Sequence, residues 1–306
     1  MLAPAESDRQ ETALRGLLGR GYRLEASPHA TGRPDRVTFW LVSASGVPVV
    51  AKIYPEGLGQ QAFMNMQRLW RSSFGERRQP PGLPRPLDFL PDLGALILER
   101  LRGQPLLELG PVNPKHLEGS VQLLVALHNC EAQPEIRRTS PGIVRSMRRK
   151  VALLAQIAPQ HHAAIVPVVE ALERIRPKDS ELVPSHGDFS PRNVLVAGDR
   201  LAVIDWDRFQ LADPARDVAY FGISAWRADL QRGQWPDRSL LEWTVKCYES
   251  LRPDADLGPQ LRFHIAAGLV RMACSLVQLW PQEAWLVPAL GKLALRELQP
   301  ETYAEA

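Results

Sequence analysis

The sequence is poor in cysteine, and this excludes a fold that depends on disulfides. Only three cysteines occur in 306 residues, and they are Cys130, Cys247 and Cys274. Their number is odd, and no two of them have the spacing of a zinc-binding Cys-x-x-Cys pair. We therefore expect a protein of a reducing compartment, with neither a disulfide framework nor a zinc knuckle.

Long apolar runs and a large excess of charge are also absent. No stretch reaches the roughly 18 consecutive apolar residues that a membrane-spanning helix needs. Near the N-terminus, Glu6, Asp8 and Glu11 stand where a signal peptide would have its apolar core. The net charge of +3 is too small to indicate nucleic-acid binding. We therefore expect a cytoplasmic protein, a monomer or homodimer, that binds neither membranes nor nucleic acid.

The first third of the chain mixes helical and strand-like patterns. A short helix is predicted over 7–19, three strand-like runs follow it, and a second amphipathic helix is predicted over 58–73. The segment 79–91 contains five prolines, and we interpret it as a rigid surface loop that leads into a strand over 95–98. This part of the chain therefore predicts a small antiparallel sheet with helices.

The pattern breaks at Glu99–Gly103 and becomes helical beyond that point. The only strand-like interruption of the helical period is a short hairpin over 194–204. We therefore predict an α+β fold with an N-terminal lobe of residues 1–101 and a mainly helical C-terminal lobe of residues 102–306.

The residues that indicate chemistry lie on either side of this hairpin. Asp188 is followed five positions later by Asn193, and Asp205 comes directly after the hairpin. This is the spacing of a kinase phosphoryl-transfer centre, in which one carboxylate takes a proton from a hydroxyl group. An amide oxygen and a second carboxylate are hard ligands that suit magnesium. Because an antiparallel hairpin returns the chain to its starting end, we expect Asn193 and Asp205 to reach one ion.

A cation for the phosphates stands earlier in the chain. Lys52 follows Val50 and Ala51 in a strand-like run, which matches the kinase pattern V-A-I-K with one residue fewer. An exposed lysine on a strand is commonplace, so this signal is weak on its own. Its value lies in the order of the motifs along the chain, with Lys52 first, then Asp188 with Asn193, then Asp205.

Together these motifs resemble the aminoglycoside phosphotransferase and choline kinase superfamily, whose folds are related to protein kinases. The resemblance rests on His186-Gly187-Asp188 with Asn193 and on Ile204-Asp205-Trp206. The runs Ile97–Leu101 and Asp213–Asp217 support it and fall in the order of the family. The resemblance implies a bilobal protein-kinase-like fold that binds ATP between its lobes.

The resemblance also implies a role for each site residue. Asp188 would be the catalytic base, and Asn193 and Asp205 would bind magnesium. Lys52 would contact the ATP phosphates, while His186 and Asp217 would support the catalytic loop. The adenine would lie at the segment after Leu98, and the residues that would bind it there are Glu99 and Leu101.

Two departures from protein kinases point to a small acceptor. The middle residue of the H-R-D motif is Gly187 here, and Asp213-Pro214 follows Asp205 after only eight positions. This leaves little room for an activation loop or a platform that docks a peptide. We therefore expect the acceptor to be a hydroxyl group of a small molecule, an antibiotic or a hydroxylated metabolite. Acids and bases are balanced in the last third, which mildly disfavours a polycationic aminoglycoside.

One departure weakens the prediction of catalysis. The kinase lysine usually pairs with a glutamate on the next helix, but the predicted helix 58–73 has no acid. Either Glu56 reaches Lys52, or a glutamine of that helix takes the place of the glutamate. The alternative function is therefore a nucleotide-binding pseudokinase, and a hydrolase of phosphorylated metabolites is a distant third. Two interpretations of Asp207 are equally open. It contacts the substrate or the metal, or it is a polar residue that simply follows a strand.

Overall fold

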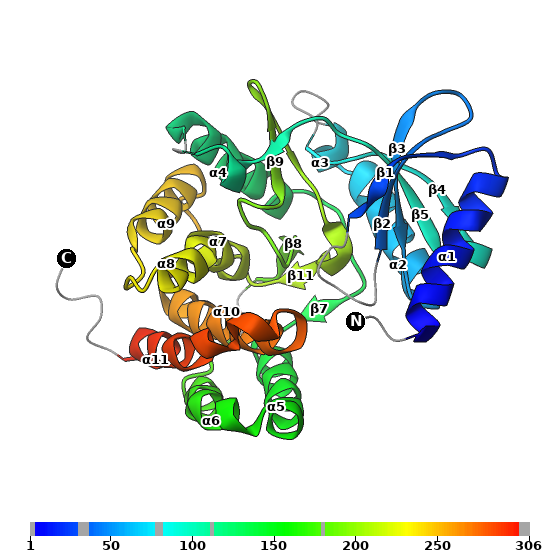
Figure 1. The fold of residues 1–306 in the computed structure, drawn as a ribbon. Helices are drawn as coiled ribbons and strands as arrows, with labels where there is room; N and C mark the ends of the chain where they lie inside the picture. Colours follow the sequence, from blue (N-terminus) through cyan, green and yellow to red (C-terminus); the bar gives the residue numbers. More distant parts are fainter. Residues whose placement is uncertain (1–3, 30–36, 77–81, 111–112, 179–180, 300–306) are drawn as a thin grey trace. The chain divides into compact units, whose positions relative to one another are not determined.

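The structure is a computed structural model, and it describes residues 4–29, 37–76, 82–110, 113–178 and 181–299 (Figure 1). The chain forms two compact units, each of which is built from two segments. The N-terminal unit comprises residues 1–109 and 194–207, and the C-terminal unit comprises residues 110–193 and 208–306.

A five-stranded antiparallel sheet forms the centre of the N-terminal unit, with its strands in the order β1-β2-β3-β5-β4. The central strand β3 has β2 on one side and β5 on the other. Val49, Ala51 and Ile53 of β3 are buried in the core. Because side chains alternate along a strand, Lys52 projects from the opposite face. The strands are β1 (Arg23–His29), β2 (Val37–Val42), β3 (Pro48–Ile53), β4 (Pro86–Leu90) and β5 (Ala95–Glu99).

Helices pack against this sheet where the apolar periodicity predicts them. Ala13 and Leu17 of α1 (Pro4–Gly19) join the buried cluster of the sheet. Helix α2 (Leu58–Trp70) packs against β4 and β5, and its Met66 and Leu69 are buried. A short helix α3 (Ser73–Glu76) follows α2. The two predicted helices therefore correspond to α1 and to α2 with α3.

The interpretation of 79–91 as a loop is wrong for its second half, because residues 86–90 form strand β4. Residues 79–81 lie outside the described residues. Strand β4 pairs with β5 from Pro86 opposite Leu98 to Leu90 opposite Ala95, with an irregularity in between. Proline is tolerated there because β4 is the edge strand of the sheet and Pro86 is its first residue.

The predicted hairpin is present and belongs to the N-terminal unit. Strands β9 (Val194–Ala197) and β10 (Arg200–Val203) pair in antiparallel fashion, and β6 (Gln104–Pro105) pairs with β9. The amide of Val203 also donates to the carbonyl of Gly82 over 2.8 Å. These bonds explain why the division into units differs from the predicted lobes. The first boundary falls after Leu109 rather than after residue 101, and residues 194–207 group with the N-terminal segment.

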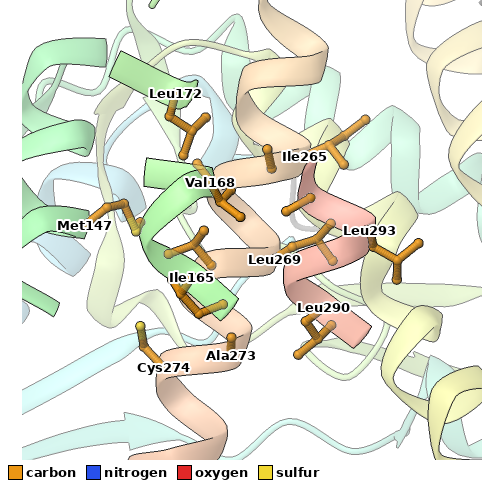
Figure 2. Packing of buried hydrophobic residues seen from close by; sticks show 14 of the residues in the cluster. Met147, Ile165, Val168, Leu172, Ile265, Leu269, Ala273, Cys274, Leu290 and Leu293 are labelled. Atoms are coloured by element: carbon orange, nitrogen blue, oxygen red, sulfur yellow. The ribbon is translucent and has the colours of Figure 1, made fainter. Parts of the chain in front are cut away.

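The C-terminal unit is mainly helical, as the sequence predicts. Its largest buried cluster is formed by α5, α6, α10 and α11 together with residues of α7, α8 and α9, and Figure 2 shows Ile165, Leu269 and Leu290 within it. Among the described helices, none is both long enough and apolar enough to span a bilayer. The helices are α4 (Pro114–His128), α5 (Ser140–Ile157), α6 (Pro159–Arg174), α7 (Ala215–Gly222), α8 (Trp226–Gln231), α9 (Ser239–Leu251), α10 (Gly258–Leu279) and α11 (Val287–Glu297).

A small three-stranded sheet in this unit supports the loop that carries Asp188. It consists of β7 (Arg137–Arg138), β11 (Gln210–Ala212) and β8 (Val183–Ser185), in that order. Strand β8 ends at Ser185, which pairs with Gln210, and the loop His186–Asp188 follows directly. All three strands are too short for a reliable sequence pattern.

Candidate active site

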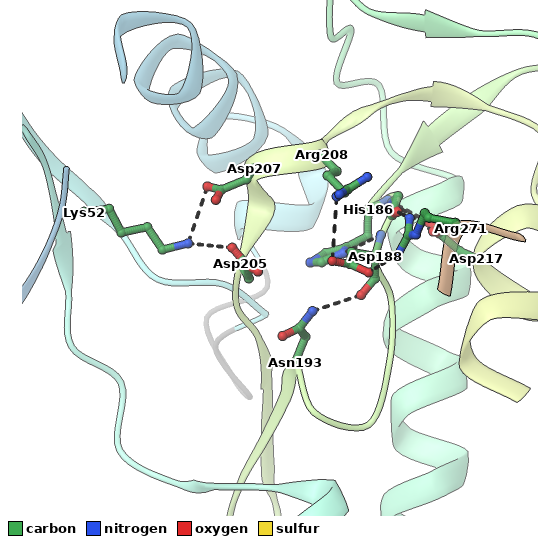
Figure 3. A network of polar contacts seen from close by, with 10 residues as sticks. Lys52, His186, Asp188, Asn193, Asp205, Asp207, Arg208, Asp217 and Arg271 are labelled. Atoms are coloured by element: carbon green, nitrogen blue, oxygen red, sulfur yellow. Dashed lines mark hydrogen bonds and ion pairs between the residues drawn. The ribbon is translucent and has the colours of Figure 1, made fainter. Parts of the chain in front are cut away.

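Lys52 lies in an acidic cluster of the N-terminal unit. Its Nζ atom lies 2.7 Å from Oδ1 of Asp205 and 3.4 Å from Oδ1 of Asp207 (Figure 3). Burial lowers the pKa of Lys52, but the charges of Asp205 and Asp207 outweigh burial and raise the pKa above its usual value. Lys52 is therefore a fixed cation.

The two carboxylates are displayed by a turn with an unusual backbone. Asp205 has φ of 67°, and it is the one non-glycine residue with positive φ among the residues that the structure describes. Such a conformation costs about 1–3 kcal/mol and is kept where the surrounding structure enforces it. Trp206 anchors this turn, because its Nε1 donates to the carbonyl of Val203 over 2.8 Å and its ring contacts Phe74.

Tyr54 completes this cluster, and the sequence analysis missed it. Its hydroxyl donates a hydrogen bond to Oδ1 of Asp207. Burial, followed by the negative charge of Asp207, keeps the pKa of Tyr54 well above its ordinary value, although Lys52 lowers it. The signal that could have found Tyr54 is its position two residues after Lys52.

The partner of Lys52 is therefore an aspartate of the hairpin turn and not a residue of α2. Among the described residues, the ion pairs of Lys52 are with Asp205 and Asp207, and Glu56 is exposed. Asp207 gives Lys52 a carboxylate partner in addition to Asp205. In protein kinases a glutamate of a helix provides such a partner.

In the C-terminal unit, Asp217 organises the loop that carries Asp188. The Asp217 carboxylate accepts hydrogen bonds from the amides of His186 over 2.7 Å and of Gly187 over 2.8 Å. Its Oδ2 also lies 3.5 Å from Nε2 of the buried His128. Burial raises the pKa of Asp217, but its interactions with His128, His186 and Arg216 outweigh burial and lower it.

Gly187 and His186 fix the path of this loop. Gly187 has φ of 75°, and a Cβ atom there would lie 2.6 Å from the carbonyl oxygen of Arg208. This contact explains why glycine stands where protein kinases have arginine. The ring of His186 is fully buried, and its Nδ1 accepts a hydrogen bond from the amide of Asp188 over 3.2 Å. The buried ring of His186 is therefore tied to the backbone of the loop at Asp188.

Two arginines hold the carboxylate of Asp188, and neither was identified from the sequence. Arg271 of α10 donates to Asp188 Oδ1 and, over 2.7 Å, to the carbonyl of Gly187 (Figure 3). Nε of Arg208 lies 3.8 Å from Asp188 Oδ2. The signal for Arg271 is its place as the one charged residue in the stretch 265–279, which is mostly apolar.

Asn193 is tied to the same loop. Its side-chain Nδ2 donates to the carbonyl of Asp188 over 2.9 Å. This bond does not use the amide oxygen of Asn193, which can accept a hydrogen bond or bind a cation. Asn193 directly precedes β9, and Val194 pairs with Val203. Among the described residues, no three or more His, Cys, Asp or Glu side chains form a metal site of their own. Magnesium needs only one or two protein ligands beside phosphate and water, and amide and carboxylate oxygens, such as those that Asn193 and Asp205 carry, are of the kind it prefers.

The two residues predicted to bind adenine end strand β5 and follow it. Glu99 pairs with Val49, and its amide donates to the carbonyl of Arg85 over 2.9 Å. Leu101 lies two residues beyond, outside the strands of the sheet. The loop continues to Gly103, which has φ of 141°, and a Cβ atom there would lie 2.9 Å from the carbonyl oxygen of Val196.

The whole set of predicted site residues lies within a match to a known protein family. The chain matches the model of the phosphotransferase enzyme family over residues 25–253. The chain belongs to this family. The prediction of a phosphotransferase is therefore confirmed, together with the resemblance on which it rests. A comparison with curated proteins finds no match.

Solved structures share the fold of this phosphotransferase at low sequence identity. A thermostable mutant of aminoglycoside phosphotransferase APH(4)-Ia, in complex with ADP and hygromycin B, aligns with 94% of this chain and 98% of its own, with a TM-score of 0.67 and 17% identity. A choline/ethanolamine kinase family protein from Mesorhizobium loti aligns with 96% and 97%, with a TM-score of 0.60 and 15% identity.

The third neighbour is the macrolide 2'-phosphotransferase MphH from Brachybacterium faecium, which aligns with 95% of this chain and 98% of its own. Its TM-score is 0.56 and its identity is 18%. The three neighbours confirm the predicted α+β, protein-kinase-like fold. Their names point to three different acceptors, so the fold by itself does not identify the acceptor of this phosphotransferase.

Proposed function

We propose that this protein transfers the γ-phosphate of ATP, in the presence of magnesium, to a hydroxyl group of a small molecule. The observation that carries the proposal is the arrangement around Asp188. Its carboxylate is held by Arg271, and the loop on which it stands is held by Asp217. Phosphoryl transfer depends mainly on positioning and on charge, and such a network supplies both.

In this proposal Asp188 orients the acceptor and takes its proton. The acceptor oxygen forms a bond to the γ-phosphorus, and the bond between that phosphorus and the bridging oxygen of ADP breaks. The proton of the hydroxyl group passes to the Asp188 carboxylate, and ADP leaves with the electron pair. The ion pair with Arg271 holds the Asp188 carboxylate in position for the acceptor.

The N-terminal unit contributes the residues that bind the nucleotide. Lys52 carries the positive charge for the phosphates, and its pairing with Asp207 through the turn after β10 keeps it in place. Glu99 and Leu101 would bind the adenine through the backbone at the end of β5. Magnesium, when bound to Asn193 and Asp205, would neutralise the phosphate charge.

The experiment that tests the proposed function is a measurement of ADP release with a panel of hydroxylated antibiotics and metabolites. We expect release that requires both magnesium and an acceptor, together with a phosphorylated product detected by mass spectrometry. Nucleotide binding without transfer to any acceptor and without slow hydrolysis would contradict the proposal.

The second candidate is a nucleotide-binding pseudokinase. The observation that favours it is the ion pair between Lys52 and Asp205, because this lysine neutralises a carboxylate that magnesium requires. Binding assays separate the two candidates. An active kinase should bind ATP more tightly when magnesium is present, whereas a pseudokinase that keeps the ion pair should bind ATP equally well without it.

A further inference from the structure

Four arginine side chains gather around the loop of Asp188 in the C-terminal unit. Arg271 and Arg208 contact the Asp188 carboxylate itself. Arg216 lies in the first turn of α7, one residue before Asp217, which binds the same loop. Arg138 lies on β7 opposite Ala212 of the neighbouring strand β11. The four come from different elements, so the fold brings them together.

Two of these arginines have no carboxylate partner. Within the residues that the structure describes, neither Arg138 nor Arg216 forms an ion pair, and Nε of each is buried without a hydrogen bond. Burial, followed by the charge of Arg271 and then by those of Arg208 and Arg138, lowers the pKa of Arg216 to about 9, although Asp217 raises it. Positive charge therefore exceeds negative charge beside Asp188.

The nearby acids already have other partners. Oδ1 and Oδ2 of Asp217 accept from the amides of Gly187 and His186. Oδ1 of Asp213 accepts from the amide of Ala215 over 2.8 Å. The Asp188 carboxylate is shared between Arg271 and Arg208. The charge of Asp217 still acts on Arg216, but among the described residues no acid forms an ion pair with Arg216 or with Arg138.

A partly buried guanidinium without a counter-ion is unfavourable, because burial removes hydration that no ion pair replaces. A bound ion that supplies the missing charge is one reason why a folded protein keeps such a group beside a functional site. Guanidinium groups bind carboxylates and phosphates through two parallel hydrogen bonds, which makes arginine suited to small anions. A polycation would instead be repelled from this cluster.

We propose that the acceptor of this phosphotransferase is an anion, a hydroxylated molecule that also carries a carboxylate or phosphate group, and that Arg216 and Arg138 bind this group. The proposal rests on the proposed function, because it places the anion next to the hydroxyl group that Asp188 orients. It excludes polycationic aminoglycosides as the preferred acceptors.

The first test compares matched acceptors in the ADP-release assay. Suitable pairs differ only in charge, for example glycerate with glycerol and gluconate with glucitol, and hygromycin B serves as a polycation. We expect the anion of a pair to have a kcat/KM about 10–100-fold higher than its neutral counterpart, as a charge-assisted hydrogen bond allows. A preference for the neutral or cationic acceptor would contradict the inference while the proposed function stands.

The second test measures binding and does not depend on turnover. The anions of the panel are titrated into the full chain without nucleotide, by calorimetry. We expect at least one to bind, and we expect Arg216→Met and Arg138→Met each to weaken that binding tenfold or more. The control is Arg148→Met, which removes the same charge from an exposed position paired with Glu173. Absence of binding to every anion, or equal binding by Arg216→Met, would overturn the inference even if transfer is observed.

Two further readouts distinguish an acceptor site from other roles of Arg216. If Arg216 bound the ATP phosphates instead, Arg216→Met would raise the dissociation constant of ATP tenfold and leave the KM of the acceptor unchanged. If Arg216 were needed for folding, the variant would unfold at a clearly lower temperature. We expect neither, and an unfolding temperature equal to or above that of the wild type, because the substitution removes an uncompensated charge.

Discussion

At the scale of single residues, the pairing of Lys52 explains how this chain dispenses with a helix glutamate. A lysine that binds phosphate needs a carboxylate to hold its ammonium group in place. Asp207 provides it at 3.4 Å and is itself fixed by the hydroxyl of Tyr54. The apparent gap in α2 therefore does not leave Lys52 without a counter-charge.

This arrangement predicts a difference between two acidic residues. Asp207→Asn keeps the shape of the side chain but removes the charge, so we expect the dissociation constant of ATP, measured by calorimetry with magnesium, to rise about 5–30-fold. Glu56→Gln is the matched control, because Glu56 is exposed and the described ion pairs of Lys52 are with Asp205 and Asp207 instead. An equal effect of the two substitutions would show that Asp207 has no special role.

His264 predicts how stability depends on pH. Burial, followed by the charge of Arg216, lowers the pKa of His264 to about 3, although Asp217 raises it. Between pH 6.5 and 3 the unfolded chain binds a proton that the folded chain excludes, so the free energy of unfolding falls as the pH falls. The slope is at most about 1.4 kcal/mol per pH unit for one group.

The measurement is urea unfolding at pH 7 and at pH 5. His264→Leu should reduce the loss of stability between these two values, whatever its effect at pH 7. His162→Leu, on the partly exposed surface of α6, should leave the loss unchanged. If the wild-type protein is equally stable at pH 7 and at pH 5, the claim that the folded protein keeps His264 unprotonated is contradicted.

Much of the candidate site could be predicted from the sequence because its residues lie in short motifs. His186, Asp188 and Asn193 are close in sequence, and a hairpin of ordinary spacing connects them to Asp205. Arg271 could not be placed in the same way, since it contacts Asp188 across 83 positions and that pairing depends on how α10 packs. Arg216 and Arg138 were not predicted for the same reason, because their positions also depend on how distant elements pack.

At the scale of elements, the long periodic helices were predictable and the short strands were not. Helices α9 (Ser239–Leu251) and α10 (Gly258–Leu279) lie in the part of the chain that the helical period predicts to be mainly helical. Strand β4 was missed because the prolines in and around it suggest a loop, and its place at the edge of the sheet makes Pro86 acceptable. Strands β7, β8 and β11 have two or three residues each, so they arise from tertiary pairing rather than from local preference.

Helix packing in the C-terminal unit predicts a large effect of one methyl group. A Cβ atom at Gly291 of α11 would lie 2.3 Å from the carbonyl oxygen of Ala164 on α6, so the two helices would have to separate. We expect Gly291→Ala to lower the free energy of unfolding by about 1–3 kcal/mol, measured in urea. Gly19→Ala has open space around its Cβ and should change stability by less than about 1 kcal/mol.

At the scale of the whole molecule, the N-terminal unit is built from two separate segments of the chain. The hairpin of residues 194–207 supplies the partner of β6 and the ring of Trp206 that packs on Phe74. A boundary drawn from composition alone could not detect this, because the hairpin lies far along the chain within a helical region.

The discontinuous unit predicts the behaviour of a fragment. Residues 1–109 alone lack the hairpin, and the removal of one buried tryptophan side chain typically costs about 3–5 kcal/mol. We therefore expect this fragment to unfold without a cooperative transition in urea, and we expect the same fragment joined by a flexible linker to residues 194–207 to regain one. Equal stability of the two would show that the hairpin is not needed by this unit.

The central claim is that Asp188 orients and deprotonates the acceptor during phosphoryl transfer from ATP. The most direct measurement is the rate of single-turnover transfer of labelled γ-phosphate by wild type and by Asp188→Asn, with the dissociation constant of ATP measured on both. We predict a rate about 10²–10⁴-fold lower for the variant, as loss of a general base causes, with ATP binding nearly unchanged. A rate within about tenfold of the wild type would contradict the account.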